Sequence, residues 1–204
     1  MNPQPNDKSS QTSTTPATGK SKTAETPFLS DITELRRRAR EHIAQGAVTT
    51  GYRADRETVL RLLNEALASE LVCVLRYKHH YFLAQGLHGK AVAAEFLEHA
   101  VDEQAHADLL AARITQLNGA PDLDPSGMLM RSHTEYGVAT SLSDMIREDL
   151  IAERVGIESY GEMIRFIADK DPTTRRLLEE ILAKEEEHAQ DMADLLVTHA
   201  GKPE

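Results

Sequence analysis

The 204-residue chain has no tryptophan, one cysteine (Cys73) and only 4% aromatic residues. A single cysteine excludes a disulfide within the chain and is typical of a reducing compartment. No apolar run approaches the ~20 residues that a membrane-spanning helix needs. The first residues also lack the basic-then-apolar pattern of a secretory signal. We therefore expect a cytoplasmic protein that does not enter a membrane.

Positive charge is also scarce, because 23 Lys and Arg face 33 Asp and Glu, for a net charge of −10. This balance argues against general affinity for nucleic acid and favours attraction of cations. Residues 1–27 contain almost nothing apolar, so they are predicted to be a disordered, solubilising tail. Lys20, Lys22 and the arginines at 36–40 could contact phosphate, which leaves a DNA-binding arm as the less favoured alternative.

Ala, Leu, Glu and Arg dominate the rest of the chain and favour helix over sheet. A short helix from residue 32 to 43, capped by Ser30 or Asp31, and a linker are predicted within 28–53. Four long amphipathic helices are predicted within 54–200, and Ser141 with Asp144 gives a cap signal for the third. They cover about 55–84, 91–117, 142–168 and 172–199.

The connections between these four helices are unequal. Short turns join the first to the second and the third to the fourth, which makes each pair an antiparallel hairpin. Residues 118–140 join the two hairpins and are long enough to return the chain to the other end of a bundle. The predicted fold is all-α, a four-helix bundle with one long crossover and a short N-terminal helix.

Both hairpins carry one pattern: a glutamate within an apolar stripe, a tyrosine seven residues later, and then Glu-x-x-His. The interval between the two glutamates is 33 residues in the first hairpin and 32 in the second. Residues three apart lie on one face of a helix. The pattern comprises Glu70, Tyr77, Glu103 and His106, then Glu153, Tyr160, Glu185 and His188.

Four ionised carboxylates in one layer of the core would repel one another and cost several kcal/mol to bury unpaired. Two divalent cations would neutralise them, and carboxylate oxygen with imidazole nitrogen suits iron or manganese, with zinc less selective. Each fragment alone is ordinary, since Glu-x-x-His is usually solvated surface and a stripe tyrosine is usually core. The joint register favours a metal site, and its ligand set is that of ferritin-like di-iron and di-manganese proteins.

With these motifs the chain resembles the bacterioferritins over about residues 55–199, in the segments 69–77, 102–108, 149–153 and 185–188. The resemblance implies a ferritin-like bundle that oxidises Fe(II) with dioxygen or hydrogen peroxide and stores ferric mineral in a homo-oligomeric cage. It implies two iron ions per subunit and makes Tyr77 the redox-active tyrosine. One iron would be held by Glu70 and His106, the other by Glu153 and His188, with Glu103 and Glu185 bridging.

The chain departs from the family pattern in several places. Gln104 stands where the family has its haem-ligating Met, so haem is not expected. Glu98 stands where the family often has His, and we interpret it as a surface residue. We expect no fifth helix after residue 199, and this ending would resemble the Dps-like cages and favour a 12-mer over a 24-mer. A related subgroup often has a cysteine pair near the site, whereas this chain has only Cys73.

Three alternatives stay open. A di-manganese catalase or a rubrerythrin-like peroxidase would use the same ligands, although the Cys-x-x-Cys module usual in rubrerythrins is absent. A Dps-like DNA-protecting protein would use the N-terminal arm. His79, His80 and His88 could guide metal inward, but surface histidines near a turn are the simpler interpretation.

Overall fold

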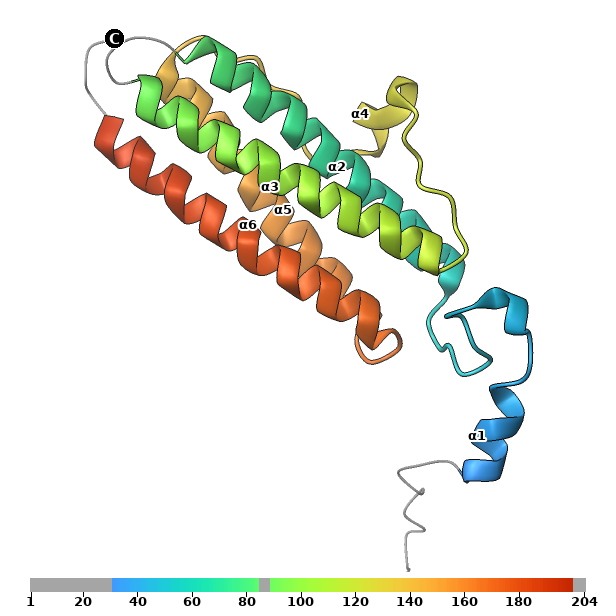
Figure 1. Ribbon diagram of the computed structural model, residues 1–204. Helices are drawn as coiled ribbons and strands as arrows, with labels where there is room; N and C mark the ends of the chain where they lie inside the picture. The colour runs from blue at the N-terminus through green and yellow to red at the C-terminus, as the bar shows by residue number, and fades with distance from the viewer. Residues whose placement is uncertain (1–30, 85–88, 200–204) are drawn as a thin grey trace, which may run out of the picture.

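The computed structural model describes residues 31–84 and 89–199, which contain helices and no strand. Four long helices form the bundle in Figure 1, so the predicted fold class is confirmed. No helix in the described part is long and apolar enough to cross a membrane. The predicted tail and His88 lie outside the described residues. In chain order the helices are α1 (Ile32–Arg38), η1 (Ile43–Gln45), α2 (Arg56–Leu83), α3 (Gly89–Gln116), η2 (Pro125–Gly127), α4 (Met128–Arg131), α5 (Leu142–Ile167) and α6 (Pro172–His199).

The ends of the long helices agree with the expected ends to within two residues, and the predicted caps are present. The Ser141 hydroxyl accepts a hydrogen bond from the Asp144 amide at 3.1 Å, and Asp31 accepts one from the Thr33 amide at 2.8 Å. The first short helix was predicted too long, because α1 ends at Arg38. It buries none of its residues, so no packing holds a further turn in place.

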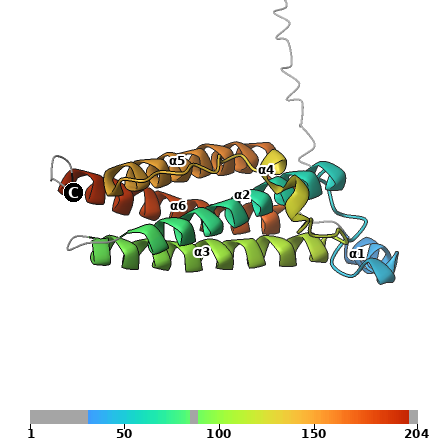
Figure 2. The same ribbon diagram turned by 90° about the horizontal axis from the view of Figure 1, so that it is seen from above.

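Each hairpin packs its two helices side by side, α2 with α3 and α5 with α6 (Figure 1). The crossover then runs along the bundle to the start of α5, as Figure 2 shows. It contains η2 and α4, which are too short to produce a periodicity that a sequence pattern could reveal. The crossover makes α2 antiparallel to α5, which decides which residues of the two hairpins meet.

Apolar side chains form two clusters at different heights in the bundle. Each fully buried Leu, Ile or Phe contributes about 1.5–3 kcal/mol relative to exposure. The first cluster includes Leu63, Leu67, Leu110, Ile114, Ile167 and Leu178. The second includes Tyr77, Val92, Phe96, Met145, Ile146 and Met192. Between these two sets, each long helix contributes a buried glutamate to one polar layer.

Asp171 fastens one end of the bundle. Its carboxylate accepts bonds from Arg113 Nη2 at 2.9 and 3.0 Å, from the Thr174 amide at 3.0 Å and from the Tyr52 hydroxyl at 2.9 Å. Burial alone would raise the pKa of Asp171, but the bonds from Thr174 and Tyr52 and the charge of Arg113 hold it below its usual value. The linker, α3 and α6 are thereby joined at one buried carboxylate.

Replacing Asp171 by Ala is expected to destabilise the fold by about 3–5 kcal/mol, because it leaves the buried Arg113 without its counter-charge. The melting temperature measured by circular dichroism should fall by roughly 10 °C. Since the pKa is lowered, this contribution is complete above pH ~4, the unfolded value, and is lost as the pH falls further. Asp169→Ala removes an exposed carboxylate two residues earlier and should leave the melting temperature unchanged; an equal loss in both variants would contradict this role.

Candidate metal centre

Six ionisable side chains meet in the polar layer between the two apolar clusters. Each long helix contributes one or two of them, and none is more than 7% exposed. They are the residues that the sequence pattern brings together: Glu70 from α2, Glu103 and His106 from α3, Glu153 from α5, and Glu185 and His188 from α6.

Glu103 lies between the two histidines. Its Oε1 is 3.2 Å from His188 Nδ1, and its Oε2 is 3.5 Å from His106 Nδ1. His106 Nδ1 also lies 3.0 Å from Glu185 Oε1 and 3.4 Å from Glu70 Oε2. The ligand atoms fall into two groups that share two glutamates, with all atoms of a group within 4.8 Å of one another: Glu70, Glu103, His106 and Glu185, and Glu103, Glu153, Glu185 and His188.

Several polar atoms of this layer are buried without a hydrogen bond in the described part of the chain. An unsatisfied buried polar atom costs about 1–3 kcal/mol, so five of them in one layer need another partner. Carboxylate oxygen and imidazole nitrogen together fit iron or manganese, and two divalent cations would contact all five. The atoms are Glu70 Oε2, Glu103 Oε2, His106 Nδ1, Glu153 Oε2 and Glu185 Oε1.

The two tyrosines of the repeat each bond to the glutamate of the opposite hairpin. Tyr77 of α2 donates to Glu153 of α5, and Tyr160 of α5 donates to Glu70 of α2. This exchange follows from the antiparallel register of the two helices. Burial, followed by the charges of the nearby carboxylates, raises the pKa of both tyrosines, so both hydroxyls keep their protons at neutral pH.

Contacts outside the six residues orient His188. Its Nε2 lies 3.2 Å from Asp102 Oδ2, and the same carboxylate oxygen lies 3.3 Å from Lys184 Nζ. A carboxylate on the outer nitrogen fixes the ring and leaves the other nitrogen free for a metal. Nδ1 of His188 is thereby directed at Glu103.

Without a cation, the centre retains protons. Burial, followed by the charges of Glu70 and Glu153, raises the pKa of Glu103, and burial with neighbouring carboxylates does the same for Glu185. Burial opposes a charge on His106, but the facing carboxylates of Glu103, Glu185 and Glu70 outweigh it and raise its pKa to about 12. His106 is therefore an imidazolium at neutral pH until a cation displaces the proton.

Sequence reasoning missed His99, a buried residue of α3 beside the centre. Its Nδ1 lies 3.1 Å from the Tyr77 hydroxyl, and its ring stacks on His188 with centroids 3.9 Å apart. Burial, followed by the charge of His188, lowers the pKa of His99 to about 3, so its ring is neutral. The available signal was its position four residues before Glu103, on the same face of α3.

The surface interpretation of His80 was wrong. This residue is fully buried, and its Nδ1 lies 2.8 Å from Asp149 Oδ2, while Arg76 donates to Asp149 Oδ1 at 2.9 Å. Position 80 is three residues beyond Tyr77 and therefore continues the inward face of α2. Glu98, in contrast, is exposed as expected.

The positions where the chain departs from the family pattern have their own contacts. Gln104 donates a hydrogen bond to Asp108 at 3.0 Å, and the absence of haem stays a prediction. Cys73 is buried, with its Sγ 3.7 Å from the Thr134 hydroxyl. Burial raises the pKa of this thiol well above its usual value, so Cys73 is a small core residue and not a reactive thiolate.

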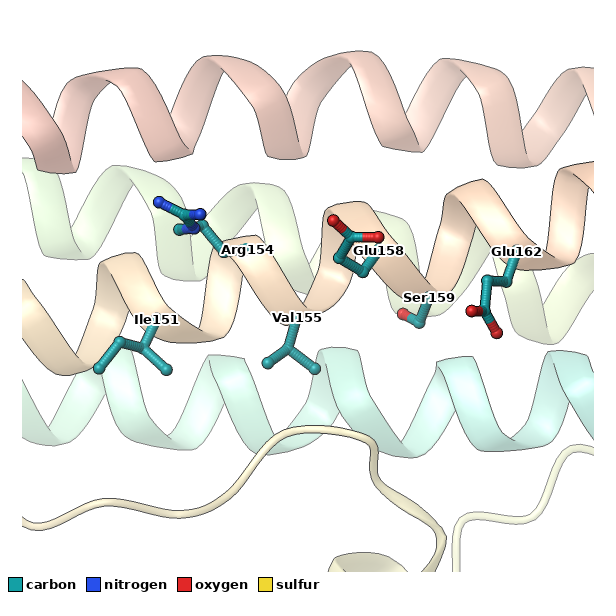
Figure 3. A pocket seen from close by; sticks show the side chains of 6 residues that line it. All are labelled: Ile151, Arg154, Val155, Glu158, Ser159 and Glu162. Atoms are coloured by element: carbon teal, nitrogen blue, oxygen red, sulfur yellow. The ribbon is translucent and has the colours of Figure 1, made fainter.

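A shallow hollow of about 450 Å³ lies along α5, away from this centre (Figure 3). None of the six ligand-type residues lines it, and its walls offer one arginine and two glutamates. We place no chemistry there. Its lining residues are Ile151, Arg154, Val155, Glu158, Ser159 and Glu162.

Comparison with known proteins gives a consistent family. A family model described as a ferritin-like domain matches residues 60–200. The solved bacterioferritin-related protein from Bacteroides fragilis, described as a dodecameric thioferritin, is 35% identical, with a TM-score of 0.70 over 72% of this chain and 89% of that one.

Two curated relatives are bacterioferritins. BfrA of Mycobacterium tuberculosis is 33% identical over 131 residues, which cover 64% of this chain and 78% of the relative. Bacterioferritin of Desulfovibrio desulfuricans is 29% identical over 140 residues, which cover 68% and 74%. A solved structure of the latter protein describes its diiron site in different catalytic states. With the bundle, the crossover and the match to residues 60–200, the chain belongs to the ferritin-like family.

Proposed function

We propose that this protein oxidises Fe(II) at the buried six-residue centre and stores the ferric product within an oligomeric cage. The observation that carries the proposal is the pair of ligand groups that share Glu103 and Glu185. Such sharing suits two cations held close together, each with its own histidine and terminal glutamate. The diiron site described for the D. desulfuricans relative supports the same assignment.

Each ligand has a distinct role in this proposal. Glu70 and His106 hold one iron, and Glu153 and His188 hold the other. Glu103 and Glu185 bridge the two, as the position of Glu103 between the histidines supports. Two bound Fe(II) ions give up one electron each, and a molecule of dioxygen accepts both with two protons to form hydrogen peroxide. Hydrogen peroxide as oxidant would accept both electrons with two protons and form two waters.

Tyr77 is proposed to assist the oxidation. It donates to Glu153 and lies beside His99, whereas Tyr160 donates to Glu70 without an imidazole among its hydrogen-bond partners in the described residues. The phenol of Tyr77 is therefore in contact with a proposed ligand and with an imidazole at the same time. Tyr160 serves to hold Glu70 in place.

Storage requires a cage, and we propose a homo-oligomer of 12 subunits. The dodecameric state described for the B. fragilis relative supports this number. Exposed large apolar side chains on the long helices, such as Leu75 at 54% and Val101 at 60%, are candidates for subunit contacts. We further propose that the protein is cytoplasmic, as the single cysteine favours.

Replacing Glu103 or His188 by Ala is expected to reduce the initial rate of aerobic Fe(II) oxidation by roughly 100-fold or more. Even residues that only orient metal ligands are worth 10- to 100-fold, and these two are proposed ligands. The rise of ferric absorbance after mixing with Fe(II) measures the rate. Glu186→Ala, which removes an exposed carboxylate next to Glu185, is the matched control and should keep the full rate.

Unchanged oxidation rates in both Glu103→Ala and His188→Ala would rule out the proposed ferroxidase function. Metal analysis of the purified protein with an oxygen-evolution assay on hydrogen peroxide separates the alternatives. Manganese with rapid oxygen release would indicate a catalase. Peroxide consumption without oxygen release, with electrons from an added reductant, would indicate a rubrerythrin-like peroxidase. A DNA gel shift lost on deletion of residues 1–40 would indicate the DNA-protecting role.

Binding of Zn(II) at neutral pH should release protons, because the cation displaces those held by His106 and the raised-pKa carboxylates Glu103 and Glu185. For the same reason the apparent affinity should fall as the pH falls. A pH indicator in weak buffer measures the release during titration. Glu186→Ala should release as many protons as the unmodified protein, and binding without proton release would show that the centre is already ionised.

Tyr77→Phe should slow Fe(II) oxidation several-fold while the amount of Fe(II) bound anaerobically stays the same. Tyr160→Phe should change the rate less, because Tyr160 has no hydrogen bond to an imidazole in the described residues. Stopped-flow absorbance gives both rates. Equal rates in the two variants would remove Tyr77 from the reaction.

A further inference from the structure

His99 has a second ring nitrogen that the six-residue centre does not use. Its Nε2 lies 3.7 Å from Asp191 Oδ2 and 4.0 Å from Glu95 Oε1. The residue is only 2% exposed, and this nitrogen makes no hydrogen bond within 31–84 and 89–199. A buried imidazole therefore directs a free nitrogen at two carboxylates of the surface.

We propose that Glu95, His99 and Asp191 form a third cation site, which takes a divalent transition metal such as Fe(II) or Zn(II). The three ligand atoms lie within 4.8 Å of one another. A metal bonded at ~2.1 Å to each ligand spans atoms up to about twice that distance apart, so a small rotation of the carboxylates closes the site. Two carboxylate oxygens and one imidazole nitrogen suit Fe(II), Mn(II) and Zn(II).

The charges around the site favour a cation. Within the described residues, neither Glu95 nor Asp191 forms an ion pair with a lysine or an arginine. Burial, followed by the charge of Asp191, raises the pKa of Glu95. The two carboxylates therefore repel each other across the imidazole, and a bound divalent cation would replace this repulsion with attraction.

Hydrogen bonding connects this site to the paired centre. If Nε2 binds a cation, the proton of His99 lies on Nδ1, which then donates to the Tyr77 oxygen 3.1 Å away. The Tyr77 hydroxyl in turn donates to Glu153, a proposed iron ligand. The imidazole of His99 and the phenol of Tyr77 thus connect the third site to Glu153. Each of the two hydrogen bonds has one donor and one acceptor.

The third site breaks the repeat between the two hairpins. His99 lies four residues before Glu103, whereas the corresponding position before Glu185 is Ile181, which belongs to an apolar cluster. The repeated scaffold therefore does not require an imidazole at this position. The side chains of Glu95 and Asp191 are 36% and 41% exposed, so solvent reaches the site from outside while His99 forms its inner wall.

In this proposal the third site binds Fe(II) from solvent before the ion enters the paired centre. This role rests on the proposed function, but the existence of the site does not. The ring of His99 stacks on His188, so a cation at the third site would lie next to the half of the centre that contains Glu153.

Crystals of the full-length protein soaked in Zn(II) test the site directly by anomalous diffraction. The unmodified protein should show a peak between Glu95, His99 and Asp191. The variant Glu95→Gln/Asp191→Asn should lose that peak and keep those of the paired centre. Glu98→Gln removes an exposed carboxylate of the same helix, three residues from Glu95, and should keep all peaks. In solution, calorimetric titration with Zn(II) should give one equivalent per chain fewer in the double variant than in the Glu98→Gln control.

Absence of the third peak while the paired centre is occupied would overturn the site, as would an unchanged equivalent count in the double variant. A third peak with an empty paired centre would sink the proposed function and leave the third site standing. At limiting Fe(II), the double variant should oxidise iron several-fold more slowly than Glu98→Gln. If the double variant loses the third equivalent of Zn(II) but oxidises Fe(II) as fast as Glu98→Gln, the third site does not supply iron to the paired centre.

Discussion

The four long helices bury four carboxylates and two imidazoles in one layer of the bundle. Without partners these groups would repel and oppose folding. Apolar clusters lie on both sides of the layer, and none of its six residues is more than 7% exposed. Glycine at position 156 leaves room for the Glu185 carboxylate, since a Cβ on Gly156 would stand 3.1 Å from Glu185 Oε2. The fold and the proposed cation site are therefore linked, because the bundle encloses the six residues and bound cations would balance their charge.

Much of this could be predicted from the sequence because two periodicities coincide. Helical spacing placed Glu70 and Glu153 in apolar stripes, and the repeat between hairpins matched each to a Glu-x-x-His. The long helices and the six residues of the centre come together as expected, since local pattern and tertiary packing agree on those positions. The antiparallel exchange of the two tyrosines needed the crossover as well, because it depends on how one hairpin lies against the other.

What could not be predicted depends on contacts between distant segments. The end of α1 reflects an absence of packing, which no local pattern reports. His80 was taken for a surface residue because it stands near a turn, yet its partner Asp149 comes from α5, 69 residues further along the chain. His99 was missed because one histidine on a helix face is usually a structural residue. Its contacts are with Tyr77 and Asp191, which lie 22 residues before it and 92 after it in the chain.

The two halves of the centre have the same types of residue but different surroundings. On one side His188 has Asp102 on its outer nitrogen and His99 stacked on its ring, and Glu153 accepts from Tyr77. On the other side, no partner within the described residues orients the outer nitrogen of His106. Outer contacts of this kind tune the affinity and reactivity of a metal position. The repeated scaffold thus supplies two matching sets of residues, each bonded to a tyrosine. Residues outside the repeat give only the Glu153 and His188 half a second imidazole and a carboxylate on its outer nitrogen.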